Sequence, residues 1–192
     1  MATKTENNTS STVKKDIVEN LTQTPESKDK DQNMADSPLH KLFVDALKDI
    51  YYAENAIVDA LEKMEAAATT EELKDAFEDH QLQTKKHISR LEKVFKMIGE
   101  QAEKKECKAI VGIIKEGEEI IKSTEEGSMT RDVGLIIAAQ KVEHYEIATY
   151  GGLVQLAITM GHEKAADLLD RTLQEEEDTD LLLTCLLYTS PS

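Results

Sequence analysis

Carboxylate and imidazole side chains interrupt the apolar stripes along which the helical segments of this chain should pack. Residues that face a neighbouring helix recur at alternating spacings of three and four. Four segments continue such a stripe and place acidic residues or histidines within it: Glu54, His80, His87, Glu143, Glu146, Glu176 and Asp180. The stripes contain no lysine or arginine that would neutralise these carboxylates. Because a buried carboxylate without a partner costs several kcal/mol, the pattern favours bound cations.

Carboxylates that converge with histidine in a dry helical core suit a pair of divalent iron or manganese ions. Bridging carboxylates would balance the charge of two cations, and imidazole would complete one end of the ligand set. The alternative is an acid-lined core held by water or by protonated carboxyl groups. Tyr150 and Tyr51 each lie one turn from a candidate ligand. Either tyrosine could hydrogen-bond to a bound ligand or carry a radical, and the competing interpretation is a core tyrosine with a satisfied hydroxyl.

Two helical hairpins are predicted to position these residues. Ser37 followed by Pro38 predicts a helix start, and the apolar spacing continues to about residue 67. A capping box of Thr69 and Glu72 predicts the start of a second helix, which should end at Gly99. A short amphipathic helix is expected over residues 107–122. Two further long helices are expected over residues 129–160 and from 162 to 180 or beyond.

The candidate ligands stand at matching depths in the two hairpins. Glu146 and Glu176 are equally far, on opposite sides, from the turn at Gly161. Glu54 and His87 stand at similar separations from the turn near residue 69, so antiparallel helices would bring all four to one level. The sequence therefore predicts an all-α fold, a four-helix bundle of two antiparallel hairpins with a short extra helix in the crossover. This is the connectivity of ferritin-like proteins.

Composition excludes several function classes. The 192 residues include 38 acidic and 23 basic side chains, a net charge of −15, which argues against nucleic acid and membrane surfaces as partners. The basic residues Lys85, Lys86, Arg90 and Lys93 are interpreted as an ordinary solvated helix face. No segment has the run of about 18 apolar residues that a membrane span needs, and no secretory signal is apparent, so a cytoplasmic location is expected.

The chain is expected to divide into three parts. Residues 1–36 are polar and predicted to form a disordered tail. Residues 37–182 form the predicted bundle. Residues 183–192 are interpreted as a truncated end. Residues 185–192 (CLLYTSPS) are interpreted as not native, because they follow an acidic helix without any residues that would cap its end.

Residues from about 38 to 180 resemble the YciE/YciF group of ferritin-like bacterial stress proteins. The stretches that carry the resemblance are LFVDALKDIYYAENAIVDAL, AFEDHQLQTKKHISRLEKVF, AAQKVEHYEIATYGGL and LQEEEDTD. The resemblance implies a dimeric ferritin-like bundle with a dinuclear metal centre and a role in stress responses. Matched residue by residue, the implied ligands are Glu54, His87, Glu143, Glu146, Glu176 and Asp180.

One position departs from the pattern of this group. Gln83 stands where the group carries a second-helix carboxylate, and glutamine is a neutral ligand that bridges metals poorly. His80, one turn earlier, could contribute in its place or serve as a core histidine. The departure puts the activity in question more than the fold.

The sequence supports two functions of different classes. The first is a stress-response protein whose iron or manganese centre oxidises metal or removes peroxide, with O2 or H2O2 as the small-molecule substrate. The second is a non-catalytic helical homodimer with a degraded metal site that acts as a structural or interaction protein. A storage cage like that of true ferritin is a third and weaker interpretation.

Overall fold

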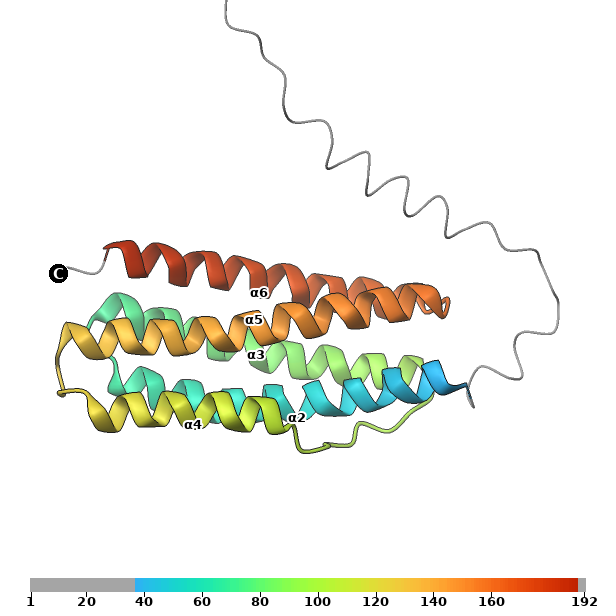
Figure 1. Cartoon of the computed structure of the whole chain (residues 1–192). Coiled ribbons are helices and arrows are strands. Elements are labelled where there is room, and N and C mark those ends of the chain that lie inside the picture. Colours follow the sequence, from blue (N-terminus) through green and yellow to red (C-terminus); the bar gives the residue numbers. More distant parts are fainter. Residues whose placement is uncertain (1–36, 190–192) are drawn as a thin grey trace, which may run out of the picture. The chain divides into compact units, whose positions relative to one another are not determined.

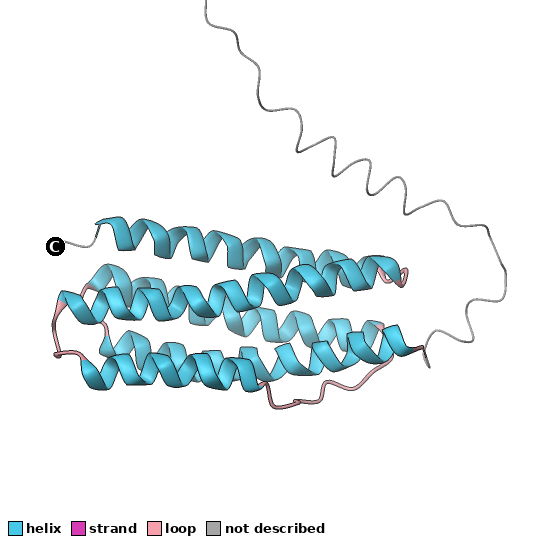
Figure 2. Ribbon diagram, viewed as in Figure 1, coloured by secondary structure: helices cyan, strands magenta, loops and turns pink. Residues whose placement is uncertain are grey.

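The protein is described here by a computed structural model that places residues 37–189. The predictions made for residues 1–36 and 190–192 lie outside this range. Within it the backbone forms helices and no strand, which confirms the all-helical class (Figure 2). The helices are α2 (Pro38–Ala67), α3 (Glu71–Met97), α4 (Lys108–Ser123), α5 (Met129–Thr159) and α6 (Glu163–Thr189).

The four long helices form two hairpins that pack side by side (Figure 1). Helix α2 pairs with α3, and α5 pairs with α6, while α2 also contacts α5 and α3 also contacts α6. The short crossover helix α4 packs on α5 and α2. The apolar stripes meet in a shared core, where Phe43, Phe77 and Phe95 are at most 1% exposed. Burial of each such side chain contributes about 1.5–3 kcal/mol to folding.

Glycines end two of the long helices at the predicted turns. Gly99 has a φ of +79° and Gly161 a φ of +76°, a left-handed conformation that glycine adopts without a steric penalty. At the start of α2, the Ser37 hydroxyl accepts a hydrogen bond from the His40 backbone N–H at 3.1 Å. The start of α2, the end of α3 and the turn of the second hairpin therefore follow the local sequence signals.

The start of α3 differs from the prediction. The N-cap is Thr70, whose side chain makes no capping hydrogen bond, so the capping box of Thr69 and Glu72 is wrong. Asp132 of α5 instead holds the two residues that lead into this helix. Its carboxylate accepts the backbone N–H groups of Thr69 at 2.7 Å and Thr70 at 2.9 Å, and also the Thr70 hydroxyl at 2.8 Å. A single buried carboxylate thus joins the turn of the first hairpin to the second.

Helix α6 packs with a register different from the one predicted. Leu173 and Asp180 are half-buried, whereas Thr172 and Thr179, which the prediction passed over, are buried. The predicted stripe, with Leu173 and Asp180, and the observed stripe, with Thr172 and Thr179, both alternate spacings of three and four around Glu176. Periodicity alone therefore favours neither. Helix α6 continues past residue 182 to Thr189, and the non-native origin of residues 185–192 stays a prediction. None of the described helices is long and apolar enough to cross a membrane.

Candidate metal centre

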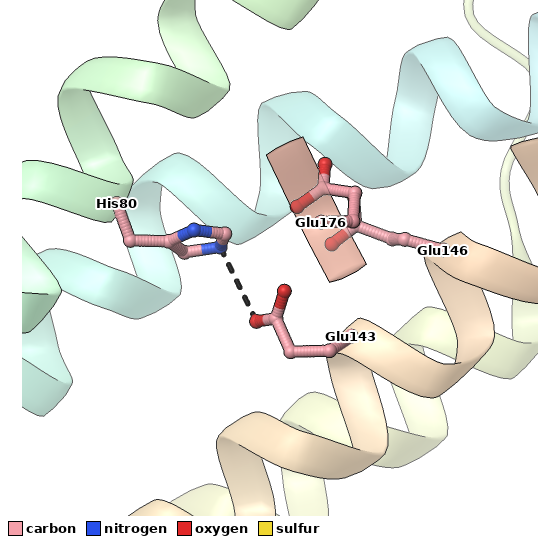
Figure 3. A group of neighbouring side chains, drawn as sticks. All are labelled: His80, Glu143, Glu146 and Glu176. Atoms are coloured by element: carbon pink, nitrogen blue, oxygen red, sulfur yellow. Dashed lines mark ion pairs between the residues drawn. The ribbon is translucent and has the colours of Figure 1, made fainter. Parts of the chain in front are cut away.

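Two groups of metal-binding side chains meet in the middle of the bundle. The first contains His80, Glu143, Glu146 and Glu176, which Figure 3 shows converging from three helices. The second contains Glu54, His87 and Glu176. Within each group the candidate ligand atoms all lie within 4.8 Å of one another. Glu176 belongs to both groups, so the two share one carboxylate.

Each of the four long helices contributes to this cluster because its polar residues replace apolar ones on the buried stripe. Helix α2 supplies Glu54 and α6 supplies Glu176. Helix α3 supplies two histidines two turns apart, and α5 supplies two glutamates one turn apart. All six side chains are at most 4% exposed. We name these six residues the carboxylate–histidine cluster: Glu54, His80, His87, Glu143, Glu146 and Glu176.

His80 lies at one end of the cluster as a neutral imidazole. Its Nε2 atom is 3.3 Å from Oε1 of Glu143, the contact drawn as a dashed line in Figure 3. Burial lowers the pKa of His80 below its ordinary value. The neutral ring is the form that donates a lone pair to a metal ion.

His87 lies at the other end and faces three carboxylates. Its Nδ1 atom is 2.8 Å from Oε1 of Glu176 and 3.7 Å from Oε1 of Glu54. Its Nε2 atom is 3.0 Å from Oε2 of Glu175, outside the cluster. Burial alone would lower the pKa of His87, but Glu176 and Glu54 outweigh burial and raise it to about 10. Without a cation, His87 therefore holds a proton that a metal ion would displace.

The partner of His87 outside the cluster is a half-buried ion pair that the sequence interpretation missed. Arg90 binds Glu175 through both of its terminal nitrogens, at 2.6 and 2.7 Å, and also donates to the Thr172 hydroxyl at 3.2 Å. Burial raises the pKa of Glu175, but Arg90 and His87 outweigh it and lower the pKa to about 2. The assignment of Arg90 to a solvated face is wrong, because its side chain is only 8% exposed. In the sequence, the position of Arg90 one helical turn after His87 is the signal that could have indicated its burial.

The cluster lacks the hydrogen bonds that buried polar atoms normally have. In the described part of the chain, all nine buried side-chain nitrogen and oxygen atoms without a regular hydrogen bond belong to these six residues, although His87 Nδ1 and Glu176 Oε1 face each other in the ion pair described above. Burial raises the pKa of Glu54, and it raises the pKa values of Glu143 and Glu146 still further, with the neighbouring carboxylates adding to the effect. Carboxylate oxygen with imidazole nitrogen is a donor set that suits divalent iron or manganese. The residues present therefore fit a metal centre.

The two candidate tyrosines have different environments. Tyr150 is fully buried, and its hydroxyl donates to Oε1 of Glu54. Burial and the nearby carboxylates raise the pKa of Tyr150 well above its ordinary value, so it remains a hydrogen-bond donor. Tyr51 instead donates to Glu92 at 3.0 Å and packs edge-on against Phe95. Only Tyr150 contacts the cluster.

Two further sequence candidates, Gln83 and Asp180, have surroundings that differ from those of the cluster residues. Gln83 is half-buried and lines a surface hollow with Lys86, Arg90 and Arg171. Asp180 is 22% exposed, with Oδ1 3.5 Å from Nε2 of the exposed His144. His80 is the α3 residue whose imidazole lies beside Glu143, at 3.3 Å.

Comparisons with known proteins agree with this architecture. Residues 38–190 match the family DUF892, described as a domain of unknown function. Protein YciF of Escherichia coli K12 is 43% identical over 149 residues, 77% of this chain and 89% of YciF. The crystal structure of YciF, described as a stress protein, has a TM-score of 0.77 at 41% identity and covers 80% of this chain and 97% of its own. YcfI from Rhodopseudomonas palustris, proposed to be structural, has a TM-score of 0.75 at 37% identity and covers 77% of this chain and 94% of its own.

Proposed function

The chain belongs to the DUF892 family, and we propose that it is a ferritin-like stress-response protein with a dinuclear iron or manganese centre. Two helical hairpins joined by a crossover support the ferritin-like connectivity. The similarity to YciF, a stress protein, supports the role in stress.

The observation that carries the proposal is the pair of ligand groups that share Glu176. Glu54, His87 and Glu176 would hold one cation. His80, Glu143, Glu146 and Glu176 would hold the other, with Glu176 as the bridge. The four carboxylates of the cluster would balance the charge of two divalent cations. The cations would in turn bind buried oxygen and nitrogen atoms of the cluster that make no regular hydrogen bond.

Such a centre, when bound, supplies redox chemistry with O2 or H2O2, and the protein would use it to oxidise metal or remove peroxide. The surrounding residues have separable tasks. The Glu175–Arg90 pair fixes the ring of His87 so that Nδ1 faces the cluster. Tyr150 orients Glu54 through its hydroxyl. The packed apolar residues above and below the cluster exclude bulk water.

Metal titration tests this proposal. Protein reconstituted anaerobically with Fe(II) or Mn(II), then desalted, should retain about two ions per chain by elemental analysis. Glu176→Gln should retain at most about one, because it removes the charge of the shared ligand. Glu177→Gln, which changes an exposed neighbour on the same helix, should match the wild type. Retention of fewer than about 0.3 ions per wild-type chain, with no thermal stabilisation by either metal, would contradict the proposal.

The second candidate function is a structural or interaction protein that uses the same helices without metal chemistry. The description of YcfI as a proposed structural protein favours it. The metal-titration result separates the two functions.

We further propose that the chain forms a cytoplasmic homodimer. Light scattering should return twice the mass of one 21.4 kDa chain. A mass of several hundred kDa would instead support a storage cage.

A further inference from the structure

A cation must cross the wall of the bundle to reach the carboxylate–histidine cluster, because the six side chains are at most 4% exposed. Glu176, which both ligand groups share, stands on α6. Helix α6 packs against α5 and against α3 (Figure 1). We call these two lines of contact the α5–α6 seam and the α3–α6 seam. Each offers a path from the surface to Glu176, and the two differ in the charge of their side chains.

The α3–α6 seam is unfavourable for a cation. Its surface hollow is lined by Lys86, Arg90 and Arg171 and by two acidic residues, Asp79 and Glu175. The Glu175 carboxylate already binds Arg90 at 2.6 Å and Arg171 at 3.3 Å. Three cationic side chains therefore face two acidic ones, one of which is occupied. A divalent cation that approaches this hollow meets net repulsion.

The α5–α6 seam carries metal-binding side chains instead. Asp180 lies one turn after Glu176 on α6, and its side chain is 22% exposed. Oδ1 of Asp180 is 3.5 Å from Nε2 of His144, whose side chain is 71% exposed. The Gln140 amide donates to the same Asp180 oxygen at 3.4 Å. The surface of this seam therefore presents a carboxylate and an imidazole, the two ligand types that the buried cluster contains.

The inner side of the α5–α6 seam holds cluster carboxylates that have no regular hydrogen bond. Glu143 directly precedes His144 in α5, and its Oε2 atom is buried and unpartnered. Both carboxylate oxygens of Glu176 are also buried without a regular hydrogen bond. Burial raises the pKa of Glu143, and the negative charges of Glu176 and Asp180 raise it further. The charge of Asp180 therefore acts on the cluster, although its carboxylate also contacts the exposed His144.

We propose that Asp180 and His144 form the entry site through which divalent cations pass from solvent to the cluster. This role rests on the proposed function, because the cations are those of the proposed centre. The two side chains would bind a partly hydrated cation weakly, and Glu143 and Glu176 would then take it over. Each transfer exchanges ligands around the cation and leaves its oxidation state unchanged. Asp180 thus controls the rate of metal uptake, whereas the family resemblance implies a resident ligand at this position.

Anaerobic loading kinetics test the entry site. Full-length protein is mixed with Fe(II), and unbound Fe(II) is trapped with a chromogenic chelator after increasing delays. Asp180→Asn should slow uptake about fivefold or more, because a neutral amide attracts the cation less and binds it more weakly. Its content at saturating Fe(II) should remain about two ions per chain, because the six cluster residues are intact. His144→Ala, at an exposed position that tolerates substitution, should slow uptake about threefold or more.

Two variants and the salt dependence serve as controls. Glu177→Gln removes the same charge from an exposed position of α6, so it should load at the wild-type rate. Arg171→Ala removes a cationic side chain from the α3–α6 seam and should also load at the wild-type rate, because entry does not pass this hollow. Higher ionic strength should slow the wild type more than Asp180→Asn, because salt screens the attraction of the Asp180 carboxylate.

The outcomes separate the entry site from the proposed function. Loading of Asp180→Asn at the wild-type rate, or faster loading in Arg171→Ala, would overturn the entry site and leave the proposed function intact. A fall to about one ion per chain in Asp180→Asn would also overturn it, because Asp180 would then be a resident ligand. Fewer than about 0.3 ions per wild-type chain would contradict the proposed function and, with it, the entry site.

Discussion

The Glu175 carboxylate lies 3.0 Å from Nε2 of His87, while Nδ1 of the same ring faces Glu176 and Glu54. One imidazole thus connects the inner cluster to an ion pair near the surface. In metal sites, a carboxylate on the second ring nitrogen fixes the orientation of the histidine and makes it a better ligand. The Arg90 guanidinium in turn holds Glu175 in place.

We expect Glu175→Gln to weaken metal binding about 10- to 100-fold, although Glu175 touches no cation in the proposed centre. The substitution removes the negative charge that holds His87, and it leaves Arg90 without its partner. Competition with a chromogenic chelator measures the affinity, with Glu177→Gln as the matched surface control. An unchanged affinity would show that the ion pair only supports packing.

We expect Gln83→Glu to leave metal content unchanged. Gln83 lines a surface hollow with Lys86 and Arg171, so we expect a carboxylate at this position to face that hollow rather than the cluster. His80→Ala should instead remove about one ion per chain, because His80 belongs to the four-residue group. Elemental analysis of both variants decides between these positions. A sharp rise in metal content in Gln83→Glu would show that the side chain at position 83 reaches the centre.

We expect Tyr150→Phe to weaken metal binding, whereas Tyr51→Phe should not. The Tyr150 hydroxyl donates to the Glu54 carboxylate, and its loss frees that ligand to rotate and leaves a buried oxygen without a donor. The loss should also lower the free energy of unfolding of the metal-free protein by about 1–3 kcal/mol. Urea denaturation and chelator competition measure the two effects. Equal metal affinities and equal free energies of unfolding in the two variants would contradict the view that Tyr150, and not Tyr51, supports the cluster.

We expect Asp132→Asn to destabilise the protein by about 1–2 kcal/mol at pH 7, because it removes the carboxylate that accepts hydrogen bonds from Thr69 and Thr70. Burial would raise the pKa of Asp132, but the hydrogen bonds from Thr69 and Thr70 outweigh burial and lower it below its ordinary value of 3.8. A lowered folded-state pKa stabilises the fold above that ordinary value, and the contribution is lost as the pH falls through the folded-state pKa.

The stability difference between wild type and Asp132→Asn should therefore shrink as the pH falls below about 4. Urea denaturation at a series of pH values measures this difference. Asp167→Asn, at an exposed position of α6, serves as the control and should stay close to the wild type at pH 7. A difference between wild type and Asp132→Asn that is independent of pH would contradict the stabilising role of the ionised carboxylate.

The stripes on α2, α3 and α5 could be predicted from sequence because apolar residues stand on both sides of each polar group. Phe43, Leu47, Ile50 and Ile57 fix the buried face of α2, so Glu54 had to point inward. The buried face of α6 was harder to predict, because threonine suits either a buried or an exposed position. Thr179 is buried and Asp180 is half-buried, although both complete a stripe with Glu176.

Contacts between distant residues could not be predicted from local patterns. Asp132 binds a turn that lies far earlier in the chain, so a search near Thr70 could not find it. Arg90 belongs to a run of basic residues whose other members are exposed, and only the packing of α3 against α6 brings it to Glu175. His80 was a candidate from its stripe position, and the approach of α5 decided its place beside Glu143.

Anomalous diffraction at the iron edge, from crystals grown anaerobically with Fe(II), tests the central claim most directly. We predict two peaks about 3.5–4 Å apart, one beside Glu54 and His87 and one beside His80 and Glu143, with the Glu176 carboxylate between them. No peak in the bundle core at saturating Fe(II), or a single peak away from Glu176, would contradict the dinuclear centre.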